Sequence, residues 1–245
     1  MSDISFFHIA SIYPKSTHFA VSRVRTFHPN NYYFIAADAV DGYEYLAEEY
    51  KTDYRRYSKK LGGPVGNYGY RLDNVLEFLN RFQTACSRCK TTHIMMMEDD
   101  VYLNGEIIVD DDWEMACHNI AEWGNKLPEQ LMEKIQIYSD YRPKIGNYCA
   151  GGGSIFKVST FLENYDIIVK WFERNFNEIQ SYYPTIGYID CFMNVYYYLC
   201  GKDYTINPYM VDTHNHKPGF DYEQFISTLP DKIQIVNNYK KYYYE

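Results

Sequence analysis

The stretch His-Ile-Met-Met-Met-Glu-Asp-Asp-Val-Tyr-Leu-Asn-Gly, residues 93–105, decides the fold. Within it, the apolar residues 94–97 run directly into three carboxylates, Glu98, Asp99 and Asp100. A short continuous apolar run of this kind is typical of a strand that is buried on both faces, as in a parallel sheet. We therefore expect a central strand over residues 94–97 in an α/β fold.

The three acids at the end of this strand need a partner. Adjacent carboxylates repel one another, and burying them unpaired would cost roughly several kcal/mol. In an open α/β sheet, ligands bind just beyond the carboxyl ends of the strands. A hard divalent cation that arrives with a diphosphate would neutralise the acids economically. A solvated acidic turn is the plainer alternative, but the apolar run pins these acids to a strand end.

Composition and charge narrow the class of protein. The chain has 245 residues, of which 46% are hydrophobic and 23% charged, a globular balance. The net charge of −8 gives no support to nucleic-acid binding. No apolar run approaches the ~20 residues of a membrane span. The first residues lack the basic region and apolar core of a secretory signal. We expect a cytoplasmic protein without a membrane anchor.

The six cysteines are scattered through predicted strands and helices. We interpret them as reduced thiols of an intracellular protein. Cys86 and Cys89 form a CxxC pair that His93 follows, a pattern that could suggest zinc. A single pair lacks the second half of a structural zinc site, so zinc remains a minor alternative.

The first part of the chain alternates strand and helix. Strands are expected over residues 4–12 and 31–37, and helices over residues 17–26 and 43–51. This βαβ beginning indicates a parallel sheet in a nucleotide-binding half. The charged residues 51–60 are expected to be solvated.

A glycine-rich stretch over residues 61–69 must be a loop, and its backbone can approach a ligand closely. It is neither a Walker A loop nor a GxGxxG that follows a strand. A helix is expected over residues 70–86, with Arg71 and Asn74 in its first turn. The helix dipole there favours an anion, which Arg71 could help to bind, although a plain surface charge is an equal alternative.

The second half is less regular. Three glycines, residues 151–153, enter a strand, which suggests close approach to a substrate, although a bulge alone would explain them. The expected elements are helices over residues 113–124, 128–134, 161–176 and 188–200, and strands over residues 135–139, 150–157 and 204–207.

The order of elements, with the acidic triplet (residues 98–100) at the end of a central strand, resembles the metal-dependent nucleotide-sugar glycosyltransferases of the GT-A fold. The triplet is similar to the EDD variant of their DxD motif. The resemblance implies a single domain over residues 1–245 with a mostly parallel central sheet flanked by helices. Residues 1–104 would form a Rossmann-like nucleotide-sugar-binding half, and residues 105–245 an acceptor-binding and metal-closing half.

The resemblance also implies a metal site. Asp100 would coordinate a divalent cation, Mn²⁺ or Mg²⁺, that bridges the donor diphosphate. Glu98 or Asp99 would reach the ribose or the water shell of the metal. Near the end of the sequence, His214 or His216 resembles the metal-binding histidine of glycogenin-like enzymes. The compressed spacing does not say which of the two would be the ligand.

Further residues would bind the donor by the same resemblance. The nucleotide would lie at the first two strand ends, marked here by Ala10, Ser11 and Asp38. Arg71 and Asn74 match the Arg or Asn that similar enzymes carry in the helix before the acidic strand. The remaining matches are Lys217 for the phosphates and Gly152 and Gly153 for the wall of the donor sugar.

The implied reaction moves a sugar from a nucleoside-diphosphate sugar to a hydroxyl of a glycan, a glycoprotein or a small acceptor. An inverting enzyme needs a carboxylate to take the acceptor proton. Asp190, which opens the helix expected over residues 188–200, is our candidate. An Asp that serves only the helix end is at least as good an interpretation. In a retaining enzyme Asp190 could instead contact the donor sugar, and the sequence leaves the stereochemistry open.

Three rival functions remain. A metal-dependent nucleotidyltransferase usually has a glycine-rich basic loop after its first strand, which residues 11–15 do not resemble. A metallonuclease is suggested by His-Asn-His at residues 214–216, but three contiguous residues are no nuclease motif and the chain is acidic. A non-enzymatic module that binds nucleotides or sugars would leave the acidic triplet and the glycine-rich stretches without a shared purpose.

Overall fold

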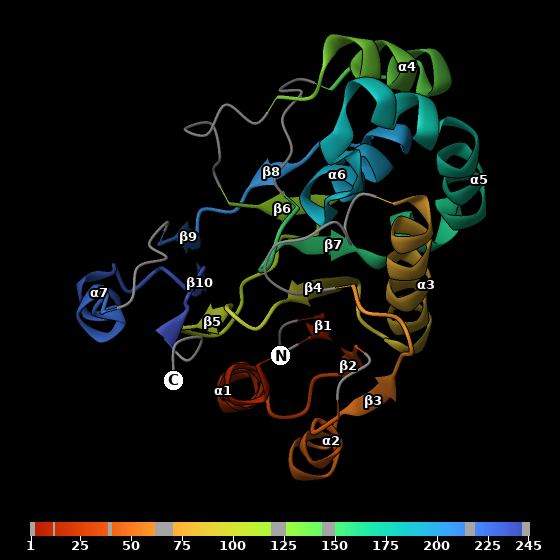
Figure 1. The fold of residues 1–245 in the computed structure, drawn as a ribbon. Helices are drawn as coiled ribbons and strands as arrows, with labels where there is room; N and C mark the ends of the chain where they lie inside the picture. Colours follow the sequence, from red (N-terminus) through yellow and green to blue (C-terminus); the bar gives the residue numbers. More distant parts are fainter. Residues whose placement is uncertain are drawn as a thin grey trace.

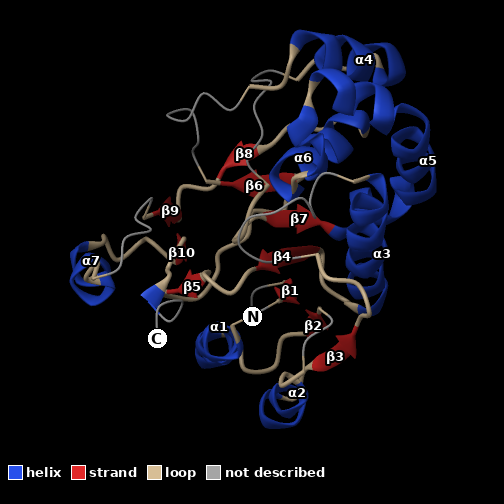
Figure 2. Ribbon diagram, viewed as in Figure 1, coloured by secondary structure: helices blue, strands red, loops and turns tan. Residues whose placement is uncertain are grey.

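Two sheets form the framework of the computed structural model (Figures 1 and 2). The larger has seven strands in the order β3-β2-β1-β4-β7-β6-β8, and the smaller has three in the order β5-β10-β9. The structure describes residues 3–11, 13–38, 41–61, 71–118, 126–143, 150–213 and 219–241.

The large sheet is mostly parallel, because β1 pairs in parallel with both β2 and β4, β2 with β3, and β6 with β8. Strand β7 alone runs antiparallel to its neighbours β4 and β6. Its strands are β1 (Ile4–Ala10), β2 (Tyr33–Ala37), β3 (Asp53–Arg56), β4 (His93–Met97), β6 (Met115–Cys117), β7 (Ile155–Lys157) and β8 (Thr205–Ile206).

Helices cover both faces of the large sheet, with α1 and α2 on one side and α3, α5 and α6 on the other (Figure 1). Alternate residues of β1 enter the two cores: Phe7 packs with the α3 side and Phe6 with the α1 side. The helices are α1 (Pro14–Phe27), α2 (Glu44–Tyr50), α3 (Leu72–Arg88), α4 (Glu129–Ser139), α5 (Val158–Tyr182), α6 (Ile189–Leu199) and α7 (Tyr222–Thr228), with a short 3-10 helix η2 (Pro184–Gly187).

The expected α/β class and its central strand are confirmed. Strand β4 is buried along its whole length and lies inside the sheet between β1 and β7. The predicted strands that correspond to β1, β2, β7 and β8, and the predicted helices that correspond to α1–α3, α5 and α6, are present with shifted ends. The large sheet takes strands from both sides of residue 104.

Two local predictions were wrong. The helix expected over residues 113–124 is replaced, where the structure describes it, by strand β6. The strand expected over residues 135–139 is the second half of α4, in which Leu131 and Ile135 are buried at helical spacing while Ile137 is 83% exposed. The charged residues 51–60 are mostly exposed or partly exposed, as expected, and residues 53–56 of them form β3, the edge strand, which tolerates its charges there.

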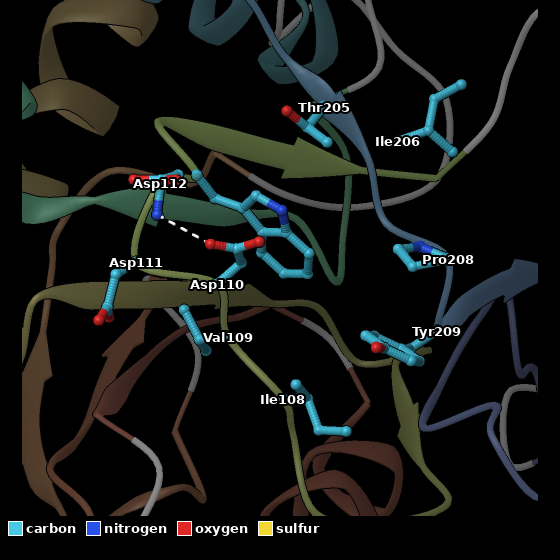
Figure 3. A pocket seen from close by; sticks show the side chains of 10 residues that line it. Ile108, Val109, Asp110, Asp111, Asp112, Thr205, Ile206, Pro208 and Tyr209 are labelled. Atoms are coloured by element: carbon cyan, nitrogen blue, oxygen red, sulfur yellow. Dashed lines mark hydrogen bonds between the residues drawn. The ribbon is translucent and has the colours of Figure 1, made fainter.

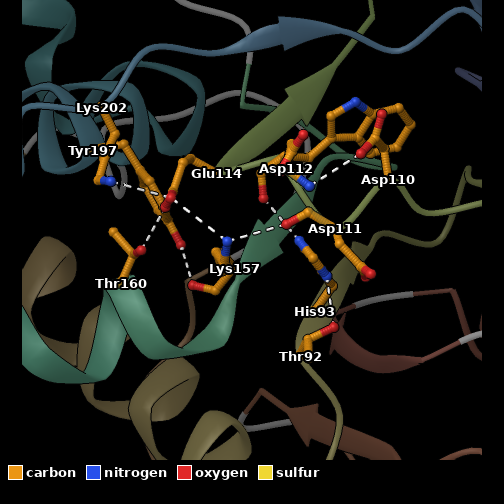
Figure 4. Close-up of polar contacts among 11 residues, drawn as sticks. Thr92, His93, Asp110, Asp111, Asp112, Glu114, Lys157, Thr160, Tyr197 and Lys202 are labelled. Atoms are coloured by element: carbon orange, nitrogen blue, oxygen red, sulfur yellow. Dashed lines mark hydrogen bonds and ion pairs between the residues drawn. The ribbon is translucent and has the colours of Figure 1, made fainter.

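A polar network fixes β7, the strand that follows the three glycines (Figure 4). Glu114, just before β6, accepts hydrogen bonds from the Thr160 hydroxyl (2.5 Å) and from Lys202 Nζ (3.1 Å). Lys157 Nζ lies 3.6 Å from the same carboxylate, and the Lys157 carbonyl accepts a hydrogen bond of 2.9 Å from the Tyr197 hydroxyl. The network joins β6, β7, α5 and α6, and so fixes the end of β7 opposite to its glycines.

The small sheet lies beyond the carboxyl end of β4 (Figure 1). Its central strand β10 (Ile235–Asn237) pairs in parallel with β9 (Met210–Asp212) and antiparallel with β5 (Tyr102–Leu103). Strand β5 follows the acidic triplet after one residue, so the small sheet begins where the large sheet ends. Within the described part of the chain, no helix is both long enough and apolar enough to cross a membrane.

Candidate active site

The acidic triplet ends β4 next to the glycines that precede β7. Because β4 and β7 are antiparallel, with Met95 paired with Ile155, the carboxyl end of β4 runs alongside the residues that precede β7. The Gly153 amide donates to the Met96 carbonyl (2.8 Å), and the Met96 amide donates to the Ser154 carbonyl (2.9 Å). These two bonds set residues 151–153 against residues 98–100.

Asp99 is tied into the protein. Its Oδ1 accepts a hydrogen bond of 2.5 Å from the Thr17 hydroxyl and lies 3.0 Å from His8 Nε2. The other nitrogen of His8 contacts the Tyr33 hydroxyl at 2.7 Å. Asp99 therefore joins β4 to α1 and β1, and the predicted contact of this residue with a ribose or a metal-bound water stays untested.

Asp100 is buried on the other side of the chain. Its Oδ2 lies 3.6 Å from Lys240 Nζ, and its carbonyl accepts a hydrogen bond of 2.8 Å from the Tyr239 amide. Its Oδ1 is buried and has no hydrogen-bond partner among the described residues. Burial raises the pKa of Asp100 to about 6, although the Lys240 ammonium opposes that shift.

Glu98 faces the glycines. Burial, and next the nearby charge of Asp100, raise the pKa of Glu98 well above its usual value, and Asp190 adds to the same effect. A Cβ on Gly152 would lie 3.0 Å from Glu98 Oε2 and 2.8 Å from Val101 Cγ2. Glycine at position 152 is what lets the Glu98 carboxylate occupy this place.

Asp190 lies on the opposite wall, in the first turn of α6. It keeps access to solvent, yet enough protein surrounds it that desolvation raises its pKa, an effect that nearby His118 opposes. A Cβ on Gly151 would lie 3.3 Å from Asp190 Oδ1, so this glycine also leaves room for a carboxylate. Asp190 combines raised basicity with solvent access, as a general base requires.

His118 and Asp212 lie beside the carboxylates of Asp100 and Asp190. His118 follows β6, and its Nε2 lies 3.5 Å from Asp212 Oδ2 at the end of β9. His118 Nδ1 is buried without a hydrogen-bond partner among the described residues. Asp212 Oδ2 also accepts hydrogen bonds from the side-chain amides of Asn237 (3.1 Å) and Asn238 (2.6 Å). Sequence reasoning missed all four residues, because the pairing of β9 with β10 brings together Asp212, Asn237 and Asn238, and His118 joins them from the end of β6.

Residues 237–240, at and after the end of β10, line one side of the site next to Asp100 and Gly152. Asn237 Oδ1 is buried with no hydrogen-bond partner in the described part of the chain, and lies where a Cβ on Gly152 would be 3.2 Å away. Asn238 has a left-handed backbone with φ of +60°, which turns the chain toward Asp100. Tyr239 and Lys240 then contact Asp100 through a backbone amide and an ammonium group. We call residues 237–240 the asparagine–lysine segment.

Asp100 provides one ligand oxygen suited to a hard divalent cation, but the described residues around it do not form a complete set of metal ligands. Asp100 offers a buried carboxylate oxygen that has no other partner in the described residues. The described ranges contain no group of three or more His, Cys, Asp or Glu side chains placed to hold a metal. Cations such as Mg²⁺ are often bound by one or two carboxylates, with water and substrate phosphates as the other ligands. The predicted residues His214, His216 and Lys217 lie outside the described part of the chain.

Asp38 has a structural role that the sequence did not reveal. It is fully buried at the end of β2, where its Oδ1 accepts a hydrogen bond from Arg81 (2.7 Å) and its Oδ2 accepts one from the Leu61 amide (3.0 Å). The Asp38 amide donates to the Ala10 carbonyl (2.9 Å). Ser11, the next residue, is mostly buried at the same edge of the sheet.

The remaining predicted donor residues differ in exposure. The Arg71 side chain is 72% exposed at the start of α3 and pairs with Asp73 at 3.0 Å. Asn74 is mostly buried in the first turn of the same helix. Gly153 has φ of +87°, and a Cβ there would lie 2.6 Å from Met210 Cε, so this glycine permits packing against the small sheet.

A separate cavity of about 600 Å³ lies beside the edge strand β8 (Figure 3). It does not include the triplet or Asp190. The amide of Asp112 donates to Asp110 Oδ1 (3.0 Å) at its rim, and Trp113 and Tyr209 give it aromatic surface. Its lining consists of Ile108, Val109, Asp110, Asp111, Asp112, Trp113, Thr205, Ile206, Pro208 and Tyr209.

Comparisons with known proteins give a distant likeness. No protein-family model and no curated protein matches the chain. Among solved structures, it is similar to a crystal structure of S. aureus TarS at 12% identity and a TM-score of 0.41, over 67% of this chain and 30% of that one. A crystal structure of TarS residues 1–349 gives the same identity and TM-score over 65% of this chain and 49% of that one. The chain thus spans less than half the length of either.

Proposed function

We propose that the protein is a glycosyltransferase that moves a sugar from a nucleoside-diphosphate sugar to an acceptor hydroxyl with the help of Mn²⁺ or Mg²⁺. The observation that carries this function is the state of Asp100. Its carboxylate is buried just past the carboxyl end of a central strand, has one oxygen without a hydrogen-bond partner among the residues that the structure describes, and has a raised pKa. A carboxylate in this state gains from a hard cation.

Asp100 would hold the cation, with donor phosphates and water as further ligands. His214 and His216 remain candidate ligands, and Lys217 a candidate phosphate contact. When bound, the cation would supply Lewis-acid stabilisation of the charge that develops on the leaving diphosphate. Glu98 lies close enough to Asp100 for the Asp100 charge to raise its pKa, so a cation on Asp100 would also favour the charged form of Glu98.

The acceptor proton would go to Asp190 if the reaction inverts the anomeric carbon. Burial raises the pKa of this carboxyl and so its basicity, while solvent access leaves it reachable by an acceptor hydroxyl. Gly151 and Gly152 face Asp190 and Glu98, which makes their backbone a fitting wall for a donor sugar between the two carboxylates.

The nucleotide would bind at the edge formed by the ends of β1 and β2. Ala10 and Ser11 lie there, and Arg71 and Asn74 open the next helix. Asp38 would act on the nucleotide through the chain around residue 61, since both of its oxygens bind protein groups.

The test is a screen of nucleotide-sugars for Mn²⁺-dependent turnover, followed by the variant Asp100→Asn. We expect the variant to lose at least about a hundredfold in metal-dependent kcat/KM, because an amide does not replace an anionic ligand. Asp231→Asn, at an exposed aspartate away from the site, is the matched control and should keep full activity. Circular dichroism should show that both variants are folded.

Two results would contradict the proposal. Unchanged activity of Asp100→Asn would remove Asp100 from the site. Release of pyrophosphate, instead of a nucleoside diphosphate, would identify a nucleotidyltransferase.

A further inference from the structure

We propose that Lys240 couples the cation to the donor: its ammonium group neutralises Asp100 in the free protein and moves to the diphosphate when the donor arrives. This role rests on the proposed function and adds to it. Free Asp100 would then bind a divalent cation poorly, and the nucleoside diphosphate would create the metal site.

The position of Lys240 is the first support. Its Nζ lies 3.6 Å from Asp100 Oδ2, close enough for strong attraction but too far for a hydrogen bond. The side chains of Lys240 and Asp100 are 22% and 8% exposed. Lys240 also lowers the pKa of Glu98, against the larger effects that raise it. Of the cations in the described chain, this is the one that pairs with the triplet's Asp100.

Contacts of Tyr239 fix the backbone of the asparagine–lysine segment. The Tyr239 amide is bonded to the Asp100 carbonyl (2.8 Å), and the Tyr239 ring stacks on Phe19 and Tyr102 with centroids 5.7 and 4.6 Å away. Lys240 therefore starts from a set position. Its four-carbon side chain can carry the ammonium group to a new partner without moving that backbone.

Competition between two cations follows from this geometry. An ammonium group and a divalent cation at the same carboxylate repel each other through a poorly screened medium. A diphosphate brings several negative charges, so that both cations can be accommodated, one on Asp100 and the other on the phosphates. The unpartnered Asp100 Oδ1 is the oxygen left for the metal.

The test measures Mn²⁺ binding by the loss of the free-ion electron paramagnetic resonance signal. It uses the full-length protein alone, and then with UDP, GDP, ADP or inorganic pyrophosphate in turn. We expect Lys240→Gln to bind Mn²⁺ without nucleotide about tenfold more tightly than the unaltered protein, because one repelling charge is gone. In Lys240→Gln, the nucleoside diphosphate should strengthen Mn²⁺ binding less than in the unaltered protein.

Two further variants make the result specific. Lys240→Arg keeps the charge and should behave like the unaltered protein. Lys241→Gln alters the next lysine, whose Nζ pairs with Glu223 at 2.5 Å outside the site, and should change nothing. Thermal unfolding of each variant checks that it is folded.

The outcomes separate this role from the proposed function. Equal Mn²⁺ affinity of Lys240→Gln and the unaltered protein, with diphosphate still recruiting Mn²⁺, would overturn the role of Lys240 alone. Tight Mn²⁺ binding by the unaltered protein without any diphosphate would also overturn it. No Mn²⁺ binding with any of the four probes would overturn the metal-dependent function and, with it, this role.

Discussion

At the scale of single residues, three consecutive acids have three different environments. Asp99 is bound by Thr17 and His8, Asp100 lies beside Lys240, and Glu98 faces Gly152. Residues 99 and 100 lie in a turn just after β4, where the Val101 amide donates to the Glu98 carbonyl (3.1 Å). The chain changes direction there, so the three neighbouring side chains reach different parts of the protein. A motif of adjacent acids therefore does not act as one unit.

Gly152→Ala should damage the site without unfolding the protein. The new Cβ would lie 2.8 Å from Val101 Cγ2 and 3.0 Å from Glu98 Oε2, so it would push the Glu98 carboxylate from its place. We expect kcat/KM for the donor to fall about a hundredfold, as for displacements of about 1 Å in other sites.

Gly105→Ala is the matched control for this change. Its Cβ would meet Gln234 Cγ at an ordinary 3.5 Å, and activity should be kept. Equal activity of the two variants would show that the space beside Gly152 is not needed.

Asp100→Asn should stabilise the protein at neutral pH although it removes activity. The folded-state pKa of Asp100 is raised from 3.8 to about 6, so the folded protein holds this proton more tightly than the unfolded chain. The free energy of unfolding of the protein therefore falls as the pH rises from about 4 to 6, and the contribution of Asp100 to this fall is about 3 kcal/mol at most.

Urea unfolding of both proteins at pH 4 and pH 7.5 checks this sign. The variant should gain on the unaltered protein at pH 7.5 and match it at pH 4. A variant that is less stable at pH 7.5 would show that the Asp100 charge is favourably compensated in the fold.

At the scale of elements, β2 and α3 are joined by a buried ion pair. Arg81 is fully buried, donates to Asp38, Glu77 (2.9 Å) and the Lys59 carbonyl (2.5 Å), and lies over the Tyr57 ring at 4.1 Å. The pair fixes both the end of β2 and the chain that leads toward residue 61.

Arg81→Met should therefore cost about 3–5 kcal/mol of unfolding free energy, because it leaves the Asp38 charge buried and unpaired. Arg88→Met, on the same helix, breaks an exposed pair with Asp53 (3.4 Å) and should cost about 1 kcal/mol or less. Chemical denaturation gives both values. If the two variants lose similar amounts of unfolding free energy, groups other than Arg81 compensate the charge of Asp38.

Elements with a strong local signal could be predicted from the sequence. The apolar runs of β1, β2 and β4 need burial on both faces, which only a central position in a sheet provides. Strands β5, β9 and β10 have two or three residues and no usable period, so tertiary pairing alone defines them. The strand predicted over residues 135–139 failed because a short apolar run fits either type of element.

In the candidate site too, the residues that could be predicted are those with a local signal in the sequence. Asp100 and Asp190 stand out because each follows or opens a recognisable element, and the structure places both near Glu98. His118, Asp212 and Lys240 carry no local signal, since their role depends on contacts between distant strands. The place of Asp38 at a strand end suggested a ligand contact. The sequence did not reveal that both of its carboxylate oxygens accept hydrogen bonds from protein groups.

At the scale of the whole molecule, the site lies where the two sheets meet. Gly152 faces the end of β4, whereas Gly153 packs against Met210 and Ile235 of the small sheet. The large sheet has seven strands and two cores, but the small sheet has three short strands. Small sheets with few ladder bonds open more easily than long buried ones.

Hydrogen exchange should reveal this difference. We expect the amides of β1 and β4 to exchange slowest, and those of β9 and β10 several-fold or more faster. MnCl₂ with UDP or GDP should slow exchange over residues 235–240, because ligand binding at Asp100 stabilises the asparagine–lysine segment. Peptides from α4, away from the site, are the internal control, and an equal effect there would argue against binding at this place.

The asparagine–lysine segment also has a consequence for biosynthesis. Lys240 is made about 140 residues after Asp100, so the acids wait for their cation until most of the chain has been translated, at about 5–20 residues per second. In the complete fold the Lys240 charge lowers the pKa of Asp100 against the effect of burial, and a chain that has not yet reached residue 240 lacks this compensation. A chain that ended between β8 and β10 would contain all the strands of the large sheet but would lack Lys240.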